Sequence, residues 1–108
     1  MIARQAFFEG TIHAGREAEF RVFVEERLMP LWRLFPGVLD VRVLFSQTRD
    51  EGAPPFALSL AMTFENEEAL AAALQAPVRF ESRALTGELM QMFDGHIHHH
   101  VFELHSAL

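Results

Sequence analysis

The chain has 108 residues, a formal net charge of −6 and no cysteine. This length fits one domain, which we predict to span residues 1–108. The nine basic residues are scattered, so neither nucleic acid nor an anionic membrane surface is expected as a partner. No apolar run is long enough to span a membrane, and the first ten residues lack the plan of a signal peptide. We therefore expect a soluble, cytoplasmic protein without disulfides or thiolate metal sites.

The first predicted elements are a strand and a long helix. Residues 4–13 carry an extended pattern that includes Phe7, Phe8 and Ile12. After Gly15, apolar residues recur at helical spacing, at Phe20, Phe23, Val24, Leu28, Leu31 and Phe35. Pro30 should kink this helix or end its regular part near Met29.

Two strands follow, at residues 38–46 and 56–64, separated by a polar loop. Each alternates, and its large residues share one face: Leu39, Val41, Val43 and Phe45 in the first strand, and Phe56, Leu58, Leu60, Met62 and Phe64 in the second. We expect this face to lie under the helices. Phe23, Leu28, Val43 and Leu60 should then share one core.

The last part of the chain predicts two helical pieces and a strand. Asn66 is a good N-cap for a helix over residues 67–76, which stops or bends at Pro77. Residues 78–93 continue as a helix that turns Phe80, Leu85, Leu89 and Met92 towards a core. Asp94-Gly95 is a turn signal, and residues 95–104 form the last strand.

This order of elements predicts an α+β, ferredoxin-like β-α-β-β-α-β fold, with a four-stranded antiparallel sheet and both helices on one face. The opposite face then carries small and mixed side chains: Asp40, Arg42, Ala57, Ser59, Ala61 and Thr63. Such a face suits a second sheet, so a homodimer is favoured over a monomer whose sheet faces water.

Two segments of the chain resemble EthD-like proteins of the dimeric α/β-barrel superfamily. The passage Glu-Glu-Arg-Leu-Met-Pro-Leu at residues 25–31, followed by Phe-Pro-Gly-Val at 35–38, is similar to their helix-to-strand passage. Residues 64–70 and 73–77 resemble their second helix. The resemblance implies a dimeric α/β barrel related to small monooxygenases. Arg27 stands where EthD-like proteins usually carry a His, so no catalytic residue is assigned.

The most unusual segment is the histidine-rich last strand. His96, His98 and His100 point to one face of a strand. A register that pairs His13 with His96, Thr11 with His98, Glu9 with His100 and Phe7 with Phe102 would place Glu9 and His13 beside them.

Three interpretations of these histidines compete. Two of them with His13 or Glu9 could bind a divalent ion, or they could serve as acid, base or ligand contact in a pocket. The sequence favours the third, a partly hydrated dimer interface, so no metal site and no cofactor is assigned. Trp32 could stack on a flat organic ligand, although packing is the commoner role of an indole at a helix end.

Two classes of function remain. The first is a monooxygenase-like or EthD-like enzyme that acts on a small apolar organic molecule, in a pocket between sheet and helices. The alternative is a non-catalytic dimer, either ligand-binding or of the stress-response type. The candidate ligand-binding residues are His96, His98, His100, His13, Glu9 and Trp32.

Overall fold

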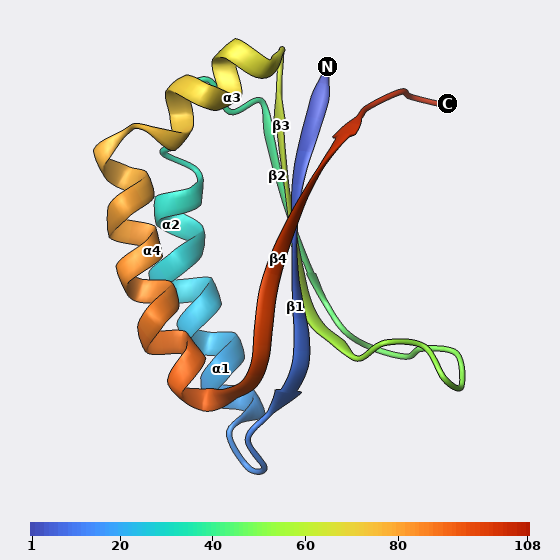
Figure 1. Cartoon of the computed structure of the whole chain (residues 1–108). Helices are drawn as coiled ribbons and strands as arrows, with labels where there is room; N and C mark the ends of the chain where they lie inside the picture. The colour runs from blue at the N-terminus through green and yellow to red at the C-terminus, as the bar shows by residue number, and fades with distance from the viewer.

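The architecture is a single antiparallel sheet covered by helices on one face. The computed structural model describes residues 1–108. Its strands are β1 (Ile2–Ile12), β2 (Asp40–Phe45), β3 (Phe56–Phe64) and β4 (Phe93–Glu103), in the order β2-β3-β1-β4. Its helices are α1 (Glu17–Phe23), α2 (Met29–Trp32), α3 (Glu67–Leu74) and α4 (Pro77–Leu89), with a π-helical turn at Val24–Leu28 and a 3₁₀ turn at Met90–Met92. Figure 1 shows every helix on the same side of the sheet, which confirms the predicted ferredoxin-like fold.

The first helix is irregular where Pro30 predicts a break. The π-helical turn Val24–Leu28 separates α1 from α2, and Pro30 lies in the first turn of α2. A proline has no N–H to donate to the carbonyl four residues earlier, so the turn that precedes it is free to widen. Val24 and Leu28 stay fully buried. The irregular turn therefore keeps the apolar stripe of the helix on the sheet.

The second helical region divides at Pro77, as predicted. The side-chain oxygen of Asn66 accepts a hydrogen bond of 2.9 Å from the Ala69 N–H and caps α3. Phe80, which was expected to point to the core, is instead 51% exposed on α4. The reason is the position of α4, which turns Ser82 and Leu89 inward.

The last strand begins earlier than predicted, at Phe93, and Asp94-Gly95 lies inside it rather than in a turn. Gly95 pairs with Gly10 of β1. A Cβ on Gly95 would lie 2.0 Å from the Glu9 carbonyl oxygen, and one on Gly10 would lie 2.1 Å from that of Asp94. The two glycines thus allow the backbones of β1 and β4 to approach closely. In the sequence, Asp94-Gly95 has the pattern of a turn.

The core lies between the sheet and the helices. Phe20, Val24 and Leu28 of the first helix pack against the strands and α4, with Leu58, Leu60, Met62, Phe64, Leu89 and Met92 buried opposite them. Phe23 and Val43 pack at the edge of the same cluster. The prediction that Phe23, Leu28, Val43 and Leu60 share one core is confirmed.

Phe56 departs from the predicted facing. The register between β1 and β3 shifts at Phe8/Glu9, so that Phe8 pairs with Leu58 but Glu9 pairs with Phe56. This bulge turns Phe56 to the face opposite the helices, where its ring lies 5.1 Å from that of Phe7. An extra residue in one strand reverses the side chains beyond it, and the alternating sequence carries no mark of it.

None of the helices combines the length and the apolar character that crossing a membrane requires.

Candidate functional site

The pairing of β1 with β4 decides which histidines meet Glu9. Glu9 pairs with His96, Phe7 with His98 and Gln5 with His100. The predicted register, in which Glu9 paired with His100, was wrong by four residues, because β4 starts at Phe93 and the two glycines fix the close approach. A shift by an even number of residues keeps every side chain on its predicted face. Glu9 and the three histidines therefore do share one face.

The six candidate residues divide among three places. Glu9, His96, His98 and His100 lie together on the face of the sheet away from the helices, which we call the outer face. His13 lies past the end of β1, where its Nε2 is 3.0 Å from Oδ1 of Asp94. Trp32 is on the helix side of the sheet and is only 3% exposed. Trp32 therefore belongs to a site different from that of the histidines.

A cleft lies between the sheet and the helices α2 and α4, with a volume of about 390 Å³. Its apolar surface is formed by the residues Ala6, Phe8, Phe35, Leu60, Met62 and Ile97, together with Trp32. Its polar surface comes from Arg4 on β1, His99 on β4 and one side of α4. This volume and mixed lining are typical of a pocket for a small organic molecule. We call it the inner cleft.

Three arginines, Arg4, Arg79 and Arg83, line the inner cleft. No Asp or Glu lines it, and none of the three arginines forms an ion pair. Burial lowers the pKa of Arg4, and the positive charge of Arg79 lowers it further. In a protein of net charge −6, uncompensated cations gathered in one cleft favour an anionic ligand.

His99 is the residue that the sequence analysis missed. It pairs with Ala6 on the inner face of β4 and lines the inner cleft. Partial burial, together with the positive charges of Arg4, Arg79 and His98, lowers the pKa of His99 to about 4. Its imidazole is therefore uncharged at neutral pH. The alternation of β4 placed His99 under the helices, but only the arginines beside it distinguish it from a packing residue.

Trp32 offers a hydrogen-bond donor as well as an apolar surface. Its indole forms no side-chain hydrogen bond within the chain, yet no side-chain nitrogen or oxygen is both fully buried and unpartnered. The indole N–H is therefore not completely enclosed, and Trp32 lines the inner cleft. The hydroxyls of Ser82 and Thr86 instead donate to carbonyls of α4, at 2.9 and 2.8 Å.

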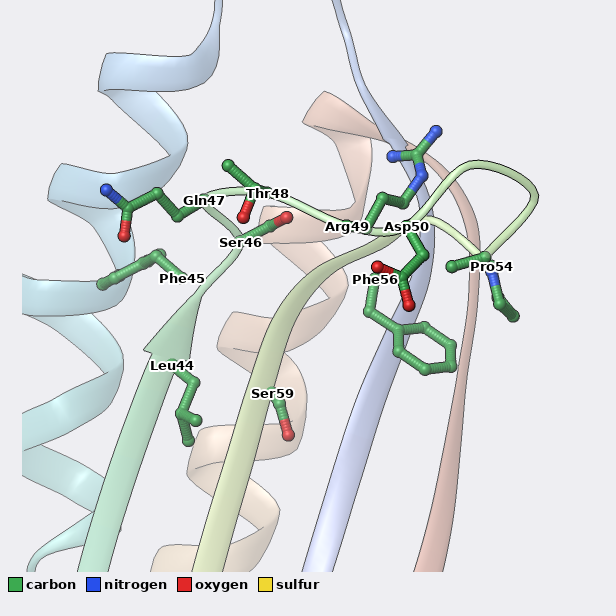
Figure 2. Close-up of a pocket in the computed structure, with 11 residues that line it drawn as sticks. Leu44, Phe45, Ser46, Gln47, Thr48, Arg49, Asp50, Pro54, Phe56 and Ser59 are labelled. Carbon is green, nitrogen blue, oxygen red and sulfur yellow. The ribbon is translucent and has the colours of Figure 1, made fainter.

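The outer face carries a second hollow, of about 630 Å³, at the ends of β2 and β3. Figure 2 shows the loop of residues 46–55 extending beyond these strands, with Leu44, Phe56 and Ser59 beside it. Leu44 is 51% exposed. In Figure 1 the same loop projects away from the helices, past the bare face of the sheet. This arrangement leaves apolar side chains uncovered on the outer face.

Comparison with solved structures finds proteins that share this fold. An EthD family protein of Bacillus halodurans aligns over 97% of this chain and 99% of its own, with a TM-score of 0.75 and 20% identity. SnoaB, a cofactor-independent oxygenase of Streptomyces nogalater, aligns over 99% of this chain and 95% of its own, with a TM-score of 0.67 and 17% identity. A dimeric protein of unknown function with a ferredoxin-like fold, from Bacteroides fragilis, aligns over 95% of this chain and 95% of its own. Its TM-score is 0.68 and its identity is 11%.

No family model matches the chain, and no curated protein sequence matches it significantly. The structural likeness extends over nearly the whole of each chain, so the fold predicted from the sequence resemblance is confirmed. Fold alone does not assign a reaction.

Proposed function

We propose that the protein is a homodimeric α/β-barrel protein whose inner cleft binds a flat, mainly apolar organic anion, and that it oxidises this ligand as a small cofactor-independent monooxygenase. The observation that carries this proposal is the gathering of Arg4, Arg79 and Arg83 in one cleft without an acidic partner. The sequence predicts a small apolar ligand. The arginine cluster indicates in addition that this ligand carries a negative charge.

The rest of the cleft defines the shape of the ligand. Trp32, Phe8 and Phe35 provide aromatic surface on which a flat ring can pack. The arginines lie at the polar side of the same space, so one end of the ligand would be apolar and the other charged. A carboxylate, a phenolate or an enolate on an aromatic ring has this division. Guanidinium groups bind such oxygens through charge-assisted hydrogen bonds.

A cationic cleft also suits oxidation without a cofactor, the activity named for SnoaB. The substrate must then supply the electrons for O₂ itself, and an ionised phenol or enol is a better electron donor than its neutral form. A CH₂ group beside the ionised ring becomes a carbonyl. One oxygen atom of O₂ enters the product, and the other leaves as water with the two hydrogens of the CH₂ group. Arginines beside the substrate oxygen lower the pKa of the phenol or enol and so raise the fraction of the substrate that is ionised.

His99 is the one titratable residue lining the cleft that is uncharged at neutral pH, since the others are arginines, and its lowered pKa makes it a weak base. This small set of acid–base groups favours one alternative, a protein that binds the anion without changing it. Both classes of function depend on the same cleft, and they differ in whether O₂ is consumed.

The homodimer is supported by the outer face. Phe7, Phe56, Leu44 and Phe102 lie there without helical cover, and Phe102 remains 45% exposed. A second copy would bury this surface by stacking sheet on sheet, and one protein of the same fold is described as dimeric.

The test of the cleft uses two matched probes, 1-naphthoate and its uncharged amide, in titration calorimetry. We expect naphthoate to bind roughly 10–100 times more tightly than the amide, as hydrogen bonds to charged groups are worth about 1.5–3 kcal/mol. Arg4→Gln and Arg79→Gln should each remove most of this difference. Arg49→Gln, in the loop away from the inner cleft, is the matched control. Equal affinity for the two probes would contradict the proposed anion site.

The same variants separate the two classes of function. Trp32 is the only tryptophan, so quenching of its fluorescence reports whether a bound ligand occupies the cleft. Oxygen uptake is then measured with aromatic ketones whose enol form is a phenol. We expect uptake by the wild type and its loss in Arg4→Gln. Quenching without oxygen uptake across such ketones would favour the non-catalytic alternative.

A further inference from the structure

Glu9, His96 and His98 bring three metal-ligating atoms together on the outer face. Oε1 of Glu9 lies 3.1 Å from Nε2 of His98 and 3.9 Å from Nε2 of His96. One ligand atom from each of the three residues lies within 4.8 Å of the other two. The first residue comes from β1 and the others from β4, so the cluster exists only because the register pairs Glu9 with His96.

These separations fit a bound transition ion. A tetrahedral ion with bonds of about 2.0–2.1 Å to nitrogen and oxygen needs ligand atoms about 3.3–3.5 Å apart. The two distances from Glu9 fall on either side of this value. Small side-chain rotations would bring all three atoms into place, and His96, whose side chain is 70% exposed, is free to rotate.

The surroundings of His98 orient its ring. While Nε2 faces Glu9, Nδ1 lies 3.4 Å from Nε2 of His100. The rings of Phe7 and Phe56 flank the same imidazole, with centroids 5.7 and 6.0 Å away. A metal-bound histidine commonly donates its second N–H to a neighbouring acceptor, which fixes the ring and its tautomer. His100 is placed to be that acceptor.

We propose that Glu9, His96 and His98 bind one divalent transition ion of the zinc class, with His100 orienting His98. Two imidazoles and one carboxylate form a ligand set that zinc accepts, and three protein ligands leave a fourth position for water. A simple hydrogen bond between Glu9 and His98 would account for the 3.1 Å contact. It would not account for the second imidazole beside the same oxygen.

The ion would lie on the surface that a second copy covers in the proposed homodimer. Its fourth position would be open to water in a monomer and enclosed between sheets in a dimer. Metal binding requires neither the dimer nor the inner cleft, because all three ligands come from one chain and the cleft lies on the other face. Failure of the metal site would therefore leave the proposed function untouched.

The test uses full-length protein freed of metal with a chelator and titrated with Zn²⁺ alone. Calorimetry should give one ion per chain, and Co²⁺ in the same site should produce the intense visible absorption of a tetrahedral complex. Glu9→Gln and His98→Gln should weaken Zn²⁺ binding by more than about 100-fold. His100→Gln, which removes only the orienting group, should weaken it by about 10–100-fold.

His105→Gln and His13→Gln are the matched controls, since these histidines contact Glu103 and Asp94 outside the cluster. Both should bind Zn²⁺ as the wild type does. Circular dichroism checks that every variant is folded. Wild-type protein that takes up no stoichiometric Zn²⁺, or a folded His98→Gln variant that binds it equally well, would overturn the site.

Discussion

His99 lies beside the guanidinium groups of Arg4 and Arg79, with His98 next to it in the strand. Its pKa in the folded protein is about 4, against 6.5 for an unperturbed histidine. The unfolded chain therefore takes up the proton first as the pH falls. The stability associated with the neutral imidazole is fully present above pH 6.5 and is lost as the pH falls towards 4.

We predict that His99→Gln flattens this part of the pH profile. Because His99 is partly in solvent, the loss should be roughly 1 kcal/mol rather than the full equivalent of the pKa difference. Urea unfolding of metal-free protein, measured at several values between pH 7 and pH 4, checks it. His105→Gln is the control, at an exposed position. If the stability of His99→Gln fell with pH as steeply as that of the wild type, other titratable groups would be responsible for the pH dependence.

The pairing of β1 with β4 depends on two glycines. A Cβ on Gly95 would also lie 2.8 Å from the Cα of Gly10 and 2.8 Å from the ring of Phe93. Since two of its three nearest contacts are backbone atoms, the strands themselves would have to move apart. We predict that Gly95→Ala lowers the free energy of unfolding by about 1–3 kcal/mol or more.

Gly87→Ala is the matched control for this substitution. Gly87 lies in α4, and a Cβ there would meet nothing within 4 Å. The same change should therefore stabilise the protein by about 0.4–1 kcal/mol, through helix propensity and a more restricted unfolded chain. Chemical denaturation of both variants gives the comparison. A Gly95→Ala variant as stable as the wild type would contradict the close approach of β1 and β4 at this position.

β3 contributes the centre of the core. Leu60 is 6% exposed and pairs with Val43 and Ala6 on the neighbouring strands. We predict that Leu60→Ala costs about 2–5 kcal/mol, through lost burial and the cavity that remains. Leu34→Ala removes the same atoms from a side chain that is 67% exposed, so it should change stability by less than about 0.5 kcal/mol. Equal denaturation midpoints for the two variants would contradict the facing of β3.

The whole molecule has one face of its sheet covered by helices and the other bare. We predict a homodimer at micromolar concentration, with a mass near twice the 12.3 kDa of the chain. Leu44→Glu and Phe102→Glu place charges on the outer face and should produce a monomer, because a buried, unpaired carboxylate disfavours association. Sedimentation equilibrium measures the mass.

Val22→Glu is the control for the dimer, since Val22 is 50% exposed on α1, on the helix side. It should leave the mass unchanged. A wild-type mass near 12.3 kDa would mean that the outer face meets water, as antiparallel sheets can.

Much of this fold is determined locally in the sequence. Alternation placed Leu58, Leu60 and Met62 on the helix side, and β3 begins and ends where the pattern predicted, at Phe56 and Phe64. Asn66 and Pro77 mark helix boundaries through capping and the missing N–H of proline. Each of these signals depends on residues a few positions apart, so a single chain can show it.

The tertiary structure alone decided what meets across the sheet. Glu9 and His96 are far apart in the chain, and their pairing depends on a register that periodicity leaves undetermined by multiples of two residues. The inner cleft likewise joins Arg4 of β1 to Arg79 of α4 and His99 of β4. The sequence shows these charges as isolated residues. Only packing α4 on the sheet makes them one cationic site, because electrostatic interactions depend on distance in space and not on separation along the chain.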